Sequence, residues 1–335
     1  MREVRDALPN LSFYLVGHEP SDTTLPADVA IDALKEASLV YGAQHVRFAG
    51  RGACNHPDLP LLIDAAIELG YTWQPCLDGT DVEALLVLLT ETRRAGLLLP
   101  YVTLDSADES VHDAARGAGS YRSSLQTLAT MAALDLPTEV RIELHRMNQA
   151  GFEQTCMLAL KLGAERLVIS LAMPASSPLD QLLALPRAAL VELAARAKRI
   201  EEVLALDVVV DPSLRAEPPF QRCPALDARW MHFGPDASLA LCDKHIGTGG
   251  PAPSSGTLRA GVVASHHELL AIGQKFYQSR LAQLHGSEQT VESPCTHCLR
   301  LFGCTHWTDD DSRPGSTPGS EPSWRNDWAG VGTSE

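Results

Sequence analysis

The sequence predicts an α/β protein in which parallel strands alternate with helices, followed by a small cysteine-rich region. Three observations lead to this prediction. Short β-type runs alternate with segments of helical apolar spacing between residues 11 and 210. Glycines stand where several of these helical segments would end. Finally, five of the eight cysteines lie from residue 223 onward, where Pro and Gly are also frequent.

The alternation of elements is regular through the first two thirds of the chain. Six strands are predicted, at 11–16, 45–49, 72–76, 101–104, 141–144 and 166–171, and the pattern breaks beyond 207–210. Helices are predicted at 26–41, 58–69, 81–95 and 187–204. The second helix illustrates the reasoning, because its apolar residues recur at i, i+3, i+4 and i+7 and Gly70 follows its end. Strands that alternate with helices in this way are parallel and joined by right-handed crossovers.

The net charge and the apolar content of the chain indicate where the protein is located and what it can bind. The chain has 335 residues and a formal net charge of -15. It contains no run of eighteen apolar residues, and it opens on MREVRD without an apolar signal segment. We therefore expect a cytoplasmic protein that contacts neither nucleic acid nor a membrane. A peptide, a small-molecule substrate or a partner enzyme is the expected partner.

The regular pattern ends near residue 211, which divides the chain into three expected parts. Residues 1–210 carry the alternating strands and helices. Residues 211–307 are irregular and rich in Pro, Gly and Cys, as in small domains held together by a metal. Residues 308–335 are rich in Asp, Ser, Pro and Gly, and we expect this tail to be disordered.

Several segments in order resemble the radical S-adenosylmethionine (SAM) family. VRFAGRGA at 46–53 and HPDL at 56–59 resemble the family's second strand, its Gly-Gly-Glu-Pro turn and the next helix start. VTLD at 102–105 with HDAARG at 112–117 resembles the fourth strand and its short helix, and GAERL at 163–167 resembles the start of the sixth unit. The resemblance implies a partial (β/α)6 TIM-like barrel with a C-terminal auxiliary-cluster domain of the SPASM or twitch type.

The chain departs from the family at two parts of one site. The family holds its SAM-cleaving [4Fe-4S] cluster with CxxxCxxC after the first strand. Here that loop reads GHEPSDTT at 17–24, and no cysteine precedes Cys54. The Gly-Gly-Glu-Pro turn, which receives the methionine end of SAM in the family, reads Gly50-Arg51-Gly52-Ala53. The resemblance therefore implies a degenerate member, with SAM binding in doubt.

The cysteines near the C-terminus predict a metal site. FGPDASLALC at 233–242 resembles the auxiliary-cluster signature, with Ala237 in place of the usual glycine, and CTHC at 295–298 adds a CxxC turn. A CxxC turn directs two thiolates at one metal, and distant residues supply the others. We expect one auxiliary [4Fe-4S] cluster, with a structural zinc ion as the alternative. The candidate ligands are Cys223, Cys242, Cys295, Cys298 and Cys304.

The ends of the predicted strands carry weaker candidates for a site, because barrel active sites gather there. Cys54, Asp105 and His145 are candidate catalytic residues, and Gly50, Arg51 and Gly52 are candidates for cofactor binding, with Arg51 able to hold an anion. The alternative for the ionisable residues is a solvated strand end. Cys76 and Cys156 have the surroundings of small core residues.

Two kinds of function fit this sequence. The first is a radical SAM-like pseudoenzyme that binds a substrate or a partner in a peptide-modification or natural-product pathway, with an auxiliary cluster that is structural or carries electrons. The alternative is an enzyme with different, non-radical chemistry in the vacated pocket, or a radical SAM enzyme completed by a second subunit. No radical SAM activity is expected of this chain alone.

Overall fold

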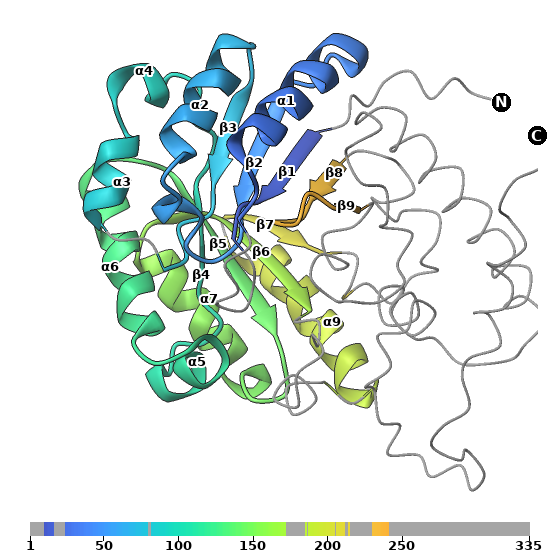
Figure 1. Cartoon of the computed structure of the whole chain (residues 1–335). Coiled ribbons are helices and arrows are strands. Elements are labelled where there is room, and N and C mark those ends of the chain that lie inside the picture. Colours follow the sequence, from blue (N-terminus) through green and yellow to red (C-terminus); the bar gives the residue numbers. More distant parts are fainter. Residues whose placement is uncertain are drawn as a thin grey trace, which may run out of the picture.

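The computed structural model describes residues 10–16, 24–79, 82–171, 185, 187–204, 206–211, 214 and 230–240. Strands and helices alternate along most of this length (Figure 1). The strands are β1 (Asn10–Tyr14), β2 (His45–Ala49), β3 (Thr72–Pro75), β4 (Tyr101–Thr103), β5 (Thr138–Leu144), β6 (Ala164–Leu171), β7 (Asp207–Val210), β8 (Trp230–Phe233) and β9 (Leu239–Ala240). The helices are α1 (Ala27–Tyr41), α2 (Leu59–Glu68), α3 (Val82–Leu88), α4 (Glu91–Arg94), α5 (Glu109–Arg116), α6 (Ser120–Ala133), α7 (Phe152–Lys161) and α9 (Arg187–Val203), with short 3₁₀ turns at Ala53–Asn55 and Gln149–Gly151.

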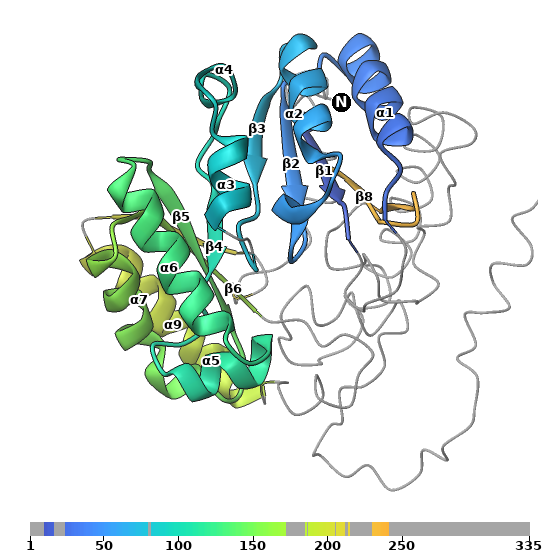
Figure 2. The ribbon, with the colours of Figure 1, turned by 60° about the vertical axis from the view of Figure 1, so that its left-hand side comes forward.

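The predicted α/β class with parallel strands is confirmed. One sheet has the order β3-β2-β1-β8-β9 and the other the order β4-β5-β6-β7. Every pairing is parallel except β8 with β9. In both views α1 to α4 stand against the first sheet, and α5, α6, α7 and α9 stand against the second (Figures 1 and 2).

The two sheets meet between β3 and β4. Isolated parallel bridges join Trp73 to Leu97 and Cys76 to Tyr101. The Asp78 carboxylate adds two hydrogen bonds, accepting from the Thr103 backbone N–H at 2.6 Å and from the Thr103 hydroxyl at 2.5 Å. The Asp78 side chain thus replaces backbone hydrogen bonds that a continuous sheet would make here. It holds the carboxyl ends of β3 and β4 together.

One predicted helix is interrupted. The sequence predicts a single helix over 81–95, but α3 ends at Leu88 and α4 begins at Glu91. Thr90 adopts an extended backbone (φ -64°, ψ 158°) and precedes the first turn of α4. The Thr90 side chain makes no capping hydrogen bond, so it is the extended backbone at this residue that separates α4 from α3 where apolar spacing alone suggests continuation.

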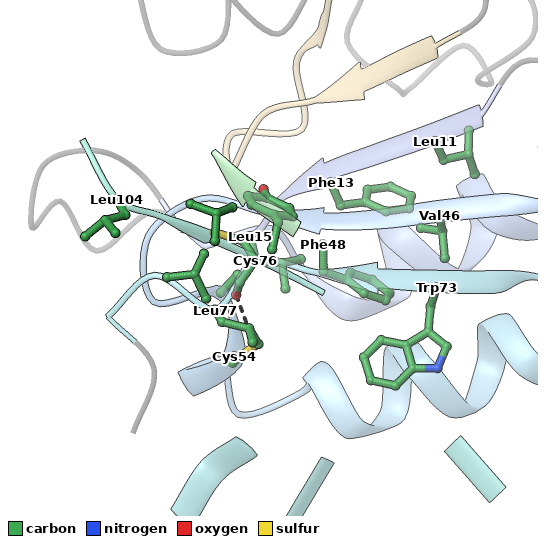
Figure 3. Packing of buried hydrophobic residues seen from close by; sticks show 14 of the residues in the cluster. Leu11, Phe13, Leu15, Val46, Phe48, Cys54, Trp73, Cys76, Leu77 and Leu104 are labelled. Carbon is green, nitrogen blue, oxygen red and sulfur yellow. Dashed lines mark hydrogen bonds between the residues drawn. The ribbon is translucent and has the colours of Figure 1, made fainter. Parts of the chain in front are cut away.

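The core lies between the sheets and their helices (Figure 3). Phe13 of β1 stacks with Phe48 of β2 and Phe233 of β8, at ring-centroid distances of 6.3 and 4.8 Å. Trp73 is fully buried, and its indole N–H donates to the Arg93 carbonyl at 2.8 Å. Cys76 and Cys156 are buried, as the sequence predicts for small core residues.

Both sheets carry polar side chains on the face turned away from the helices, here called the inner face. On β5, Val140, Ile142 and Leu144 are fully buried, whereas Glu139, Arg141 and Glu143 alternate with them and point the other way. The Tyr101 ring of β4 is contacted by Arg47 of β2 and by Arg141 of β5. The inner faces of the two sheets therefore border one shared interior.

Residues 230–240 join the first sheet through β8, which pairs with β1. The turn between β8 and β9 is closed by the Gly234 N–H donating to the Ser238 carbonyl at 2.8 Å and by the Ala237 N–H donating to the Gly234 carbonyl at 3.0 Å. Ala237 has φ +61°, the left-handed conformation that glycine adopts most easily. A glycine would adopt this backbone without strain, and glycine is the residue that the auxiliary-cluster signature has at this position.

The expected domain boundary near residue 211, the metal-binding region and the tail fall mostly outside the described residues and stay predictions. Among the helices that the structure describes, none combines the length and the apolar character that a membrane span requires.

Candidate functional site

A buried carboxylate and two partly buried ionic groups meet where β4 and β5 end. The Asp105 side chain, which is 1% exposed, accepts a hydrogen bond from Arg116 Nε at 2.6 Å through Oδ2. Its Oδ1 accepts from the Glu143 backbone N–H at 2.9 Å. Arg116 reaches from the end of α5 and also donates from Nη2 to Glu143 at 2.7 Å. One guanidinium thus bridges two carboxylates, and both oxygens of Asp105 have protein donors.

Asn148 connects this group to His145. Its side-chain amide donates to the backbone carbonyls of Asp105 and Glu143, at 2.7 and 2.8 Å, while its oxygen accepts from the His145 N–H at 2.8 Å. His112 joins from α5, where its Nδ1 accepts from the Asp105 N–H at 3.1 Å. We refer to Asp105, His112, Arg116, Glu143, His145 and Asn148 as the strand-end network.

The two histidines of the network are buried and neutral. In His112 and in His145, Nδ1 accepts from a backbone N–H, so the ring proton of the neutral form is on Nε2. Burial lowers the pKa of both rings below the usual histidine value, and the nearby Asp105 opposes this only in part. Among the described residues, no group accepts a hydrogen bond from His145 Nε2. His145 therefore offers a donor to anything that reaches it.

Arg116 is the cation that the network depends on. Burial alone would lower the pKa of its guanidinium, but Asp105 and Glu143 outweigh burial and raise the pKa well above the usual arginine value. The guanidinium stays charged at every relevant pH. Its position is fixed by α5, because the Asp108 side chain caps that helix by accepting from the Ser110 N–H at 2.8 Å.

Arg51 lies beside the network, at the C-terminal end of α5. Its guanidinium donates to the Arg116 carbonyl, a position where a cation is stabilised by the helix dipole. Gly79 (φ +66°) and Gly117 (φ +95°) leave room for it, because a Cβ at either residue would lie 3.3 or 3.2 Å from the Arg51 side chain. Gly50 and Gly52 also have positive φ, and the Gly52 N–H donates to the Asp78 carbonyl at 2.7 Å. Arg51 thus already has one partner in the protein.

Cys54 occupies a different environment from Asp105 and His145. It is buried, and its thiol donates to the Cys76 carbonyl at 3.1 Å (Figure 3). Burial raises the pKa of the neighbouring Cys76 thiol well above its usual value. The structure therefore brings two of the three catalytic candidates, Asp105 and His145, into one network and places the third against Cys76.

The predicted metal ligands, Cys223, Cys242, Cys295, Cys298 and Cys304, lie outside the described residues. The part of the chain that the structure describes contains Cys54, Cys76 and Cys156, all buried. Within this same part, no group of three or more His, Cys, Asp or Glu residues is placed to hold a metal ion. The auxiliary cluster stays a prediction from the C-terminal sequence.

Sequence reasoning missed Arg116, Glu143 and Asn148. A signal for Glu143 is present, since TEVRIEL at 138–144 alternates polar and apolar residues where a strand covered on both faces would be apolar throughout. That alternation predicts a polar inner face. Arg116 and Asn148 are separated from their partners by a helix or a turn, so no local pattern reveals them.

Comparisons with known proteins agree with the fold. No family model matches the chain. A segment of 129 residues, 38% of this chain, is 29% identical to "PqqA peptide cyclase" of Streptomyces rochei, and the match spans 35% of that protein. The chain thus matches only about a third of the length of this relative.

Several solved structures of radical SAM enzymes share this fold at low sequence identity. SuiB of Streptococcus suis bound to S-adenosylmethionine aligns with a TM-score of 0.55 at 11% identity, covering 71% of this chain and 61% of SuiB. SuiB bound to precursor peptide SuiA gives 0.56 at 11% identity, covering 72% and 61%. Native anSMEcpe with bound AdoMet and the Cp18Cys peptide gives 0.53 at 10% identity, covering 77% and 80%. The chain therefore has a radical SAM-like fold.

Proposed function

We propose that this chain is a radical SAM-like protein that has lost SAM cleavage and acts by binding in a peptide-modification or natural-product pathway. Residues 1–210 would form a partial (β/α)6 barrel, and residues 211–307 a SPASM or twitch-like domain holding one auxiliary [4Fe-4S] cluster or, alternatively, zinc. The observation that carries the proposal is the loop at 17–24, which reads GHEPSDTT and has none of the three cysteines that a SAM-cleaving cluster needs.

The strand-end network supports the same conclusion. It lies at the carboxyl ends of β4 and β5, where ligands of such folds bind. Each oxygen of Asp105 already accepts one hydrogen bond within the protein, from Arg116 and from the Glu143 N–H. Gly52 stands where the Gly-Gly-Glu-Pro turn has its glutamate, and Arg51 beside it donates to the last carbonyl of α5. A ligand at this position would have to displace internal ion pairs.

A peptide is the favoured partner class. SuiB and anSMEcpe are known with bound peptides, and the partial relative from Streptomyces rochei carries the name of a peptide cyclase. A small-molecule substrate and a partner enzyme are the other two classes that fit. The formal net charge of -15 favours a partner other than nucleic acid or an anionic membrane surface.

The test is SAM turnover by the purified chain. Protein prepared without oxygen, reconstituted with iron and sulfide, is incubated with SAM and dithionite, and 5′-deoxyadenosine is measured beside an intact radical SAM enzyme. The proposal predicts none above the protein-free control. Sustained formation of 5′-deoxyadenosine would overturn it and would favour a complete radical enzyme.

A second candidate function rests on His145. Its Nε2 proton lies buried without an acceptor among the described residues, next to the bridged Asp105–Arg116–Glu143 group. A polar substrate accepting this proton would be oriented for non-radical chemistry by the network. Replacing His145 and Asp105 in turn distinguishes the binding protein from the enzyme with non-radical chemistry. The binding proposal predicts that pathway activity survives any replacement that leaves partner binding intact.

A further inference from the structure

A second polar group lies on the inner face, nearer the amino ends of the strands. The pairing of β8, β1, β2 and β3 sets His232, Ser12, Arg47 and Gln74 side by side in one row. Arg47 Nε donates to the Gln74 side-chain oxygen at 2.8 Å. The Arg47 guanidinium lies over the Trp230 ring, 4.4 Å from its centroid, and 5.8 Å from the centroid of Tyr101. We call Ser12, Arg47, Gln74, Tyr101 and Trp230 the Arg47 cluster.

The charges around this cluster are not balanced. Arg141 is paired with Glu139 at 2.7 Å, and Arg166 with Asp207 at 2.5 Å. Arg47 has no carboxylate within 4.0 Å among the residues that the structure describes. Burial and the neighbouring Arg141 cation lower its pKa, and Tyr101, Glu139 and Tyr14 oppose this only in part. Arg47 is partly buried, and a partly buried cation without a carboxylate in contact favours an anion beside it.

Ser12 provides an independent indication of a ligand. Its side chain is fully buried, and its hydroxyl has no hydrogen-bond partner in the described structure. The neighbours of Ser12 along β1, Leu11 and Phe13, are buried on the helix-covered side, so strand alternation points Ser12 to the inner face beside Arg47. A buried hydroxyl is normally hydrogen-bonded. A donor and a cation with spare N–H groups therefore lie side by side.

We infer that the Arg47 cluster is a binding site for a carboxylate, held by the Arg47 guanidinium and the Ser12 hydroxyl. The guanidinium packs against Trp230 and Gln74 occupies Nε, so among the described residues the Nη groups are left to bind the two oxygens. One unbalanced positive charge matches one carboxylate, whereas a phosphate dianion would leave an excess negative charge. The inference goes beyond the proposed function, because it requires neither SAM nor a cluster.

The carboxylate could belong to a free small acid or to an acidic side chain of a peptide, and one assay distinguishes these sources. Binding of 4-fluorobenzoate is followed by fluorine NMR, with acetate, phosphate and two capped tripeptides, Ala-Glu-Ala and Ala-Gln-Ala, as competitors at constant ionic strength. Saturable binding is expected, displaced by acetate and not by phosphate. Displacement by the Glu peptide and not by the Gln peptide would identify the peptide as a source.

Two variants locate the binding. Ser12→Ala removes a hydroxyl without a protein partner, so it should fold like the wild type and bind about threefold to tenfold more weakly. Arg47→Met should abolish binding, and its thermal midpoint in the absence of acid shows whether the variant folds despite losing the hydrogen bond to Gln74. Arg122→Met, at an exposed site, is the matched control and should bind normally.

Three results would overturn the inference. The first is a wild-type protein that shows no saturable binding, as expected if an ordered water alone bridges Ser12 and Arg47. The second is unchanged affinity in Ser12→Ala. The third is equal displacement by phosphate and acetate, which would indicate nonspecific attraction to a cation. Should Arg47→Met fail to fold, the Ser12→Ala comparison still decides the question.

Discussion

Replacing Arg116 with methionine should destabilise the protein through Asp105. The Asp105 side chain is 1% exposed and would keep only the Glu143 N–H as a donor. Removing one partner of a buried ion pair is expected to lower the free energy of unfolding by about 3–5 kcal/mol. Because the Arg116 side chain is 28% exposed, water can approach the site, and we expect a loss of about 2–3 kcal/mol.

The assay is urea unfolding followed by circular dichroism, with matched controls. Arg122→Met breaks the exposed pair with Glu109, whose side chains are 80% and 45% exposed, and should change stability by less than about 1 kcal/mol. Asp105→Asn combined with Arg116→Met removes both charges and should be less destabilised than the sum of the single variants. A loss in Arg116→Met no larger than in Arg122→Met, or strict additivity in the double variant, would refute the reasoning.

Three further predictions follow from the fold. Ala237→Gly should raise the free energy of unfolding by about 0.5–1 kcal/mol in urea titrations, because it relieves a left-handed alanine, whereas Ala240→Gly on β9 should lower it. Trp73→Ala should lower the thermal midpoint markedly, with a loss of about 3–5 kcal/mol, because a fully buried indole and its hydrogen bond to Arg93 are removed. His145→Gln should flatten the dependence of stability on pH, because the pKa of His145 is lower in the folded state than in the unfolded state. The contribution of the neutral ring to stability is complete above about pH 6.5 and is lost as pH falls toward the folded-state pKa. Urea midpoints at pH 7.5 and 5.5 measure this difference.

Apolar spacing and helix-ending residues predict most of the strands and helices that the structure shows. Apolar spacing and Gly70 place α2 correctly, since φ +83° at Gly70 is the backbone that ends a helix. The same spacing fails at Thr90, where an extended backbone separates α3 from α4. Local chemistry thus decides where an element ends.

The candidate site is only partly predictable. Asp105 and His145 are suggested by their place at strand ends, and the structure joins them through Asn148. The bridge itself depends on Arg116, which lies eleven residues beyond Asp105 and reaches it through the geometry of α5. The Arg47 cluster depends on strand register across β8, β1 and β2. Such contacts between distant residues leave no periodic pattern in the sequence.

The central claim is that this radical SAM-like fold carries no SAM-cleaving cluster and that any iron resides in the C-terminal region. Iron, acid-labile sulfide and zinc per chain, measured on anaerobically purified wild type and on a variant with Cys295→Ala and Cys298→Ala, test it most directly. We predict about four irons and four sulfides in the wild type, or about one zinc under the alternative, and loss of the metal in the variant. About four irons retained in the variant would place a cluster elsewhere in the chain and contradict the account.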